Sequence, residues 1–146
     1  MVATPQFLEG RQRPATPADL REFDSVAMRS VFSGRVIERT LQDASGRAEL
    51  AAPRVLMTVN DPEAVLRGVL MHLGIGLLAM PDVVDRLENG ALVRLLPDWY
   101  QDPGAISLYF TSQKLLPAKT RALVDFVTEQ FRAQGLARRF SAALPI

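Results

Sequence analysis

The sequence of 146 residues contains no cysteine and a single histidine, His72. Without a thiol, disulfides, thiolate nucleophiles and zinc–thiolate sites are excluded. A lone histidine with no second ligand one helical turn away makes a poor metal site. The longest apolar run, residues 73–80, is far too short to cross a bilayer. No signal peptide is evident at the start of the sequence, so we expect a cytoplasmic protein.

Excess charge and catalytic motifs are also missing. The 17 basic and 16 acidic residues leave a net charge of +1, which is not the footprint of a nucleic-acid-binding surface. Four arginines lie close together in sequence but have acidic residues between them, which favours a solvated hairpin face over a phosphate-binding patch. These residues are Arg35, Glu38, Arg39, Asp43, Arg47, Glu49 and Arg54. No phosphate-binding loop, dinucleotide fingerprint or nucleophile elbow occurs, so we expect neither an enzyme nor a cofactor.

Residues 59–99 carry the signals of alternating helices and strands. Asn60-Asp61-Pro62 predicts a helix start, because an Asx side chain accepts from free backbone N–H groups and proline suits the first helical position. Apolar residues then recur at helical spacing, at Ala64, Val65, Leu66, Val69, Leu70 and Leu73.

The same region continues with a strand, a helix and a strand. Residues 74–80 are apolar without alternation, as in a strand covered on both faces. The Pro-Asp pair at 81–82 predicts a second helix start, the Asn-Gly pair at 89–90 its end, and residues 92–96 the next strand. This order predicts βαβ units, and therefore an α/β fold with a mostly parallel sheet flanked by helices.

Weaker signals cover the rest of the chain. Further strands are predicted at residues 1–3, 54–59 and 106–111, and a hairpin at residues 35–41 and 47–50. Thr16-Pro17 predicts another helix start, and Pro117 begins a final helix that Gly135 ends. Residues 24–34 favour no single element.

Two strand ends offer candidate ligand contacts. Asn60 and Asp61 follow a strand and begin a helix, and ligands of open α/β sheets bind beyond the carboxyl ends of strands. Thr58, Asn60 and Asp61 would then line a pocket, and a plain helix cap is the alternative interpretation of Asn60 and Asp61. Thr4 and Pro5 repeat this arrangement after the first strand, with Thr4 as the cap of a short helix.

Several segments together resemble the effector-binding domain of LysR-type transcriptional regulators. They read NDPEAVLRG at 60–68, LGIGLLAMP at 73–81 and LENGALVRLLPDW at 87–99. VATPQFL at 2–8, PATPADL at 14–20, ISLYF at 106–110 and LPAKTRALVDF at 116–126 are similar to the family's flanking segments. The family's usual Gly-Leu-Gly is His72-Leu73-Gly74 here. Histidine is among the less costly residues in the left-handed conformation that ends a helix, and its ring could meet the last carbonyls or act as a pH or metal sensor.

This resemblance implies a type-II periplasmic-binding-protein-like subdomain. Residues 1–146 would form one partial effector-binding domain, with 2–98 as its second subdomain and 106–134 as the strand and helix that return to an incomplete first subdomain. The winged helix-turn-helix with which the family reads DNA has no counterpart in the sequence, so we expect DNA binding only through that missing part.

The implied function is ligand sensing. A small-molecule effector, such as a carboxylate or an aromatic acid, would bind between two subdomains and contact Thr4, Pro5, Thr58, Asn60 and Asp61. The resemblance places the end of the first strand near this cleft. Two alternatives are a solute-binding protein and a remnant that does not bind DNA and has an interaction role. We expect a homo-oligomer, paired through residues 106–110 and the helix after Pro117, because that helix carries apolar residues around much of its circumference.

Overall fold

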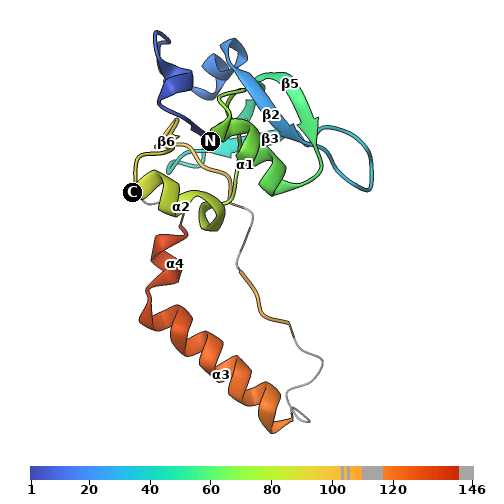
Figure 1. Cartoon of the computed structure of the whole chain (residues 1–146), viewed down its shortest axis with the longest axis vertical. Coiled ribbons are helices and arrows are strands. Elements are labelled where there is room, and N and C mark those ends of the chain that lie inside the picture. The colour runs from blue at the N-terminus through green and yellow to red at the C-terminus, as the bar shows by residue number, and fades with distance from the viewer. Residues whose placement is uncertain (103, 105, 110–116, 142–146) are drawn as a thin grey trace. The chain divides into compact units, whose positions relative to one another are not determined.

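The computed structural model describes residues 1–102, 104, 106–109 and 117–141 (Figure 1). They fall into two compact units, residues 1–101 and residues 102–141. The predicted subdomain limits, 2–98 and 106–134, stay predictions.

The first unit is built on a parallel pair of strands. β2 (Asp24–Met28) and β5 (Arg54–Val59) run side by side in the same direction (Figure 1), with a register shift between Ser25 and Val26. Ile75, which follows the helix after β5, forms a parallel bridge with Ser25. The segment around Ile75 therefore lies next to β2 in the sheet, on the side away from β5. This is the βαβ arrangement that the sequence predicts.

Antiparallel neighbours complete this sheet. β1 (Val2–Ala3) pairs antiparallel with β6 (Val93–Arg94), and Val2 also bridges antiparallel to Gly76. The order across the sheet is therefore β6, β1, residues 75–76, β2 and β5. The α/β class predicted from the sequence is confirmed, and β1 runs opposite to β2 and β5.

The predicted hairpin is present. β3 (Arg39–Gln42) and β4 (Ala48–Ala51) pair antiparallel, with Arg39 opposite Ala51. Asp43 fixes the turn, because its Oδ1 accepts hydrogen bonds from the N–H groups of Ser45 and Arg47. The Ser45 hydroxyl also donates to this carboxylate and, as the largest cause, lowers the pKa of Asp43.

Four short helices flank the strands of the first unit. They are η1 (Gln6–Leu8), η2 (Pro17–Glu22), α1 (Pro62–Leu70) and α2 (Met80–Glu88). η2 begins with a reciprocal capping box between Thr16 and Asp19, and the two hydrogen bonds that Asp19 accepts from backbone N–H groups lower its pKa. α1 packs closely on β2, since a Cβ on Gly68 would lie 2.9 Å from Val26 Cγ2.

Two predicted strands are shorter than expected. Within residues 74–80 only Ile75 and Gly76 form bridges, and α2 already begins at Met80. The predicted strand at 92–96 is reduced to Val93–Arg94. Residues 74–80 and 92–96 are apolar mainly because they are buried. Burial alone does not distinguish a strand from an extended segment that forms few backbone hydrogen bonds with neighbouring strands.

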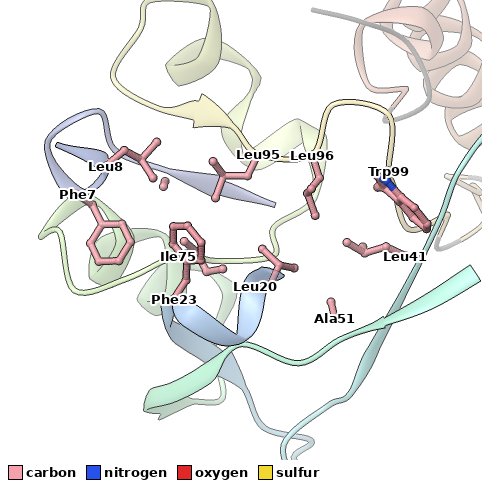
Figure 2. Close-up of a cluster of buried hydrophobic side chains, with 11 residues drawn as sticks. Phe7, Leu8, Leu20, Phe23, Leu41, Ala51, Ile75, Leu95, Leu96 and Trp99 are labelled. Carbon is pink, nitrogen blue, oxygen red and sulfur yellow. The ribbon is translucent and has the colours of Figure 1, made fainter. Parts of the chain in front are cut away.

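The core of the first unit lies between the sheet, η1, η2 and the hairpin (Figure 2). Its buried side chains are Ala3, Phe7, Leu8, Leu20, Phe23, Leu41, Ala51, Ile75, Leu95, Leu96 and Trp99. The hairpin contributes Leu41 and Ala51 to this cluster, so it is an integral part of the fold rather than an appendage.

The second unit contains α3 (Ala118–Ala133) and α4 (Leu136–Arg139). Gly135, with φ of +60°, separates them, and the rings of Phe131 and Phe140 meet edge to face at 6.2 Å. The predicted final helix is confirmed. Of the strand predicted at 106–111, residues 106–109 form no strand, and 110–111 lie outside the described residues. Within the described ranges, no helix is long and apolar enough to span a membrane.

Candidate ligand-binding site

β2 and β5 end at the same side of the sheet, which we call the carboxyl edge, after Met28 and Val59. The Arg29 N–H donates to the Val59 carbonyl oxygen at 2.7 Å and holds the two strand ends together. In sheets with parallel neighbouring strands, this edge is where ligands bind, because helix N-termini and loops with free polar groups converge there.

Three of the five predicted contact residues lie at the carboxyl edge. Thr58 is exposed near the end of β5, and Asn60 and Asp61 are exposed where α1 begins. Asp61 Oδ1 accepts from the Glu63 N–H at 3.1 Å, so the helix-cap interpretation holds for this carboxylate. The side chains of Thr58 and Asn60 form no hydrogen bond with any other residue that the structure describes, which leaves both available to a ligand.

A loop that the sequence does not predict also reaches this edge. It follows β2 and projects beyond the strand ends (light blue in Figure 1). The Ser30 hydroxyl accepts from the N–H groups of Phe32 and Ser33, and the Gly34 N–H donates to the Ser30 carbonyl oxygen. These bonds fix the conformation of the loop, in which Phe32 is 99% exposed. In the sequence, residues 24–34 favour no single element, and the Ser-Gly pair at 33–34 indicates only a turn.

Thr4 and Pro5 lie at the opposite side of the sheet. Because β1 is antiparallel to its neighbour at Gly76, its carboxyl end meets the side where β2 and β5 begin, which we call the amino edge. The structure therefore does not bring Thr4 and Pro5 together with the three residues of the carboxyl edge.

At the amino edge Thr4 contacts His72. Thr4 is 3% exposed, and its Oγ1 lies 2.7 Å from His72 Nδ1 while it accepts from the Phe7 N–H at 3.3 Å. His72 has φ of +60°, the left-handed conformation expected from the family pattern. Its ring meets a hydroxyl rather than the helix carbonyls, and the described residues hold no group of three or more potential metal ligands.

Two arginines at the amino edge, Arg54 and Arg11, are already engaged. Arg54 Nε donates to Asp24 Oδ1, and this hydrogen bond is the main cause that lowers the pKa of Asp24. Arg11 lies over the Phe7 ring at 4.7 Å and donates from Nε to the Phe7 carbonyl oxygen. These interactions stabilise the fold and leave this edge poorly suited to a ligand.

A cavity of about 250 Å³ lies between the β2–β5 pair and the β3–β4 hairpin. Aliphatic side chains form most of its lining, and none of the five predicted contact residues takes part. It is therefore distinct from the Thr58, Asn60 and Asp61 cluster.

Comparisons with known proteins identify the family of the chain. Residues 1–132 match the family model for the LysR substrate binding domain. A probable HTH-type transcriptional regulator, LtrA of Klebsiella pneumoniae, is 28% identical over 132 residues, which cover 88% of this chain and 42% of that protein. The chain therefore spans less than half the length of this relative.

Solved structures show the same fold. The regulatory domain of AphB from Vibrio vulnificus has a TM-score of 0.69 at 23% identity, covering 88% of this chain and 62% of that one. The regulatory domain of CrgA, a LysR-type transcriptional regulator from Neisseria meningitidis, has a TM-score of 0.65 at 21% identity, with the same coverage.

Proposed function

Because the chain belongs to the LysR substrate-binding domain family, we propose that it is the ligand-sensing part of a transcriptional regulator and binds a small-molecule effector at the carboxyl edge. The observation that carries this proposal is the convergence of two parallel strand ends, the N-terminus of α1 and the ordered loop with Phe32 at one side of the sheet. The side chains of Thr58 and Asn60, which have no hydrogen-bond partner among the described residues, occur there together with the fully exposed ring of Phe32.

The groups at this edge favour an effector that carries a carboxylate. Arg29 is exposed directly after β2, and no described residue forms a salt bridge with its guanidinium. The Asn60 amide and the Thr58 hydroxyl can donate to the same anion, and the partial positive charge at the start of α1 adds to their attraction. Phe32 would cover the apolar side of the ligand.

Effector binding regulates only if it distinguishes two conformations. A ligand shifts an equilibrium between states by no more than its difference in affinity for them, so we expect the effector to favour one arrangement of the regulator. DNA would be bound by residues outside this chain, since its net charge of +1 offers little counterion release.

The test is a thermal-shift screen with a panel of small carboxylates. We expect at least one compound to raise the melting temperature, and Asn60→Ala to abolish that rise without lowering the melting temperature of the free protein. Asn89→Ala is the matched control, because Asn89 is exposed at the end of α2. Equal shifts in wild type and Asn60→Ala would remove Asn60 from the site, and no shift with any carboxylate would contradict the proposed ligand class.

A further inference from the structure

Arg39 is an unusual residue on the inner face of the hairpin. Side chains alternate along a strand, so Arg39 shares its face with Ile37, which is half-buried, and with Leu41, which is 1% exposed. Directly opposite Arg39 on β4 is the buried Ala51. The hairpin thus presents an arginine toward the sheet at a position where its neighbours are apolar.

No described residue forms a salt bridge or side-chain hydrogen bond with this guanidinium. Glu38 also lines the cavity, but it is exposed and alternates to the outer face of the hairpin. The Arg39 guanidinium is therefore free to pair with an anion that enters beside these apolar neighbours.

Arg39 lines the cavity of about 250 Å³. The rest of the wall is mainly aliphatic, and Ser25, its buried polar residue, already donates from Oγ to the Arg54 carbonyl oxygen. The cavity reaches the surface at Val36, Leu50 and Val55, which are 41%, 51% and 45% exposed. A small molecule can therefore enter without unfolding of the hairpin.

We propose that this cavity is a second ligand site and that it takes an aliphatic monocarboxylate. An apolar cavity of about 150 Å³ accommodates a molecule the size of benzene, so this one has room for a chain of about six carbons. The alkyl chain of the ligand would replace poorly held water against the aliphatic wall of the cavity, and its carboxylate would pair with Arg39. The site uses none of the groups assigned to the effector at the carboxyl edge.

Isothermal titration calorimetry of the 146-residue chain with hexanoate and with 1-hexanol separates the two parts of the proposal. Both ligands test the apolar cavity, and only hexanoate tests the pairing with Arg39. We expect Arg39→Met to weaken hexanoate binding about tenfold or more, because a charge-assisted pair is lost, and to leave 1-hexanol binding nearly unchanged. Arg39→Lys should retain part of the hexanoate affinity. Arg13→Met is the matched control, since Arg13 is an exposed arginine between η1 and η2.

Arg39→Trp provides an independent measurement. An indole at this position fills the cavity, so we expect both ligands to stop binding while the melting temperature of the free protein rises. The proposal is overturned if wild type binds neither ligand at millimolar concentrations, or if Arg39→Met binds hexanoate as well as wild type does. Loss of hexanoate binding in Asn60→Ala but not in Arg39→Met would place the ligand at the carboxyl edge, and would also overturn the second site.

Discussion

Replacement of Thr4 and His72 tests how the amino edge is held. Thr4 Oγ1 has two partners, His72 Nδ1 at 2.7 Å and the Phe7 N–H at 3.3 Å. Thr4→Val keeps the side-chain volume but removes both interactions. His72→Ala removes one of them, and His72→Gly removes the same one while it relieves the left-handed backbone at φ of +60°.

The structure ranks these variants. Thr4→Val loses a hydrogen bond and leaves a buried N–H without its acceptor, which together cost about 2–3 kcal/mol of the free energy of unfolding. His72→Ala loses about 1 kcal/mol and keeps a non-glycine residue in the left-handed region. His72→Gly loses the same bond but recovers about 1 kcal/mol of backbone strain, so its stability should be close to that of wild type.

Urea unfolding followed by circular dichroism measures the three free energies. We expect the order His72→Gly, His72→Ala, Thr4→Val from most to least stable, and a loss in melting temperature of about 10 °C for Thr4→Val. A double variant with Thr4→Val and His72→Ala should lose less than the sum of the two single losses. A Thr4→Val protein within about 0.5 kcal/mol of wild type, or His72→Gly less stable than His72→Ala, would refute the reasoning.

Three further predictions follow from local features. Gly74→Ala should prevent folding of the first unit, because its Cβ would lie 2.4 Å from the Asp24 carbonyl oxygen, whereas Gly90→Ala, with open space around it, should cost only about 1 kcal/mol in the same unfolding assay. The pKa of Asp19 is lowered in the folded state, so the stabilisation from its carboxylate is present above the unfolded value near 3.9 and is lost as pH falls through the folded value. The melting temperature should therefore fall less steeply for Asp19→Ala than for wild type between about pH 5 and about pH 2. Light scattering should show self-association that Phe126→Glu reduces, since Phe126 is 60% exposed on α3; a monomer at high concentration would contradict this.

Local signals predicted the caps and the hairpin well. Asp61 and Thr16 are the N-caps of α1 and η2, as expected. A capping oxygen followed by a proline is a strong signal for a helix start, and every group involved lies within four residues of the cap. The β3–β4 hairpin was predictable for the same reason, since the turn around Asp43 is fixed by bonds within the turn.

Features that depend on distant partners were not predictable. The direction of β1 is set by its neighbours Gly76 and Arg94, which lie more than seventy residues away in sequence, and this direction separates Thr4 from the carboxyl edge. The apolar pattern also predicted too long a strand at residues 74–80, where only Ile75 and Gly76 form bridges to neighbouring strands. The exposed Phe32 is a local exception, because its loop is held by hydrogen bonds to nearby Ser30 that produce no periodic pattern in the sequence.

The most direct test of the proposed effector site is an NMR titration of the isotopically labelled chain with the carboxylate that gives the largest thermal shift. We predict that the largest amide shift changes fall at residues 29–33 and 58–63, on both sides of the carboxyl edge. Changes concentrated around Thr4 and His72, with residues 58–63 unaffected, would contradict the account.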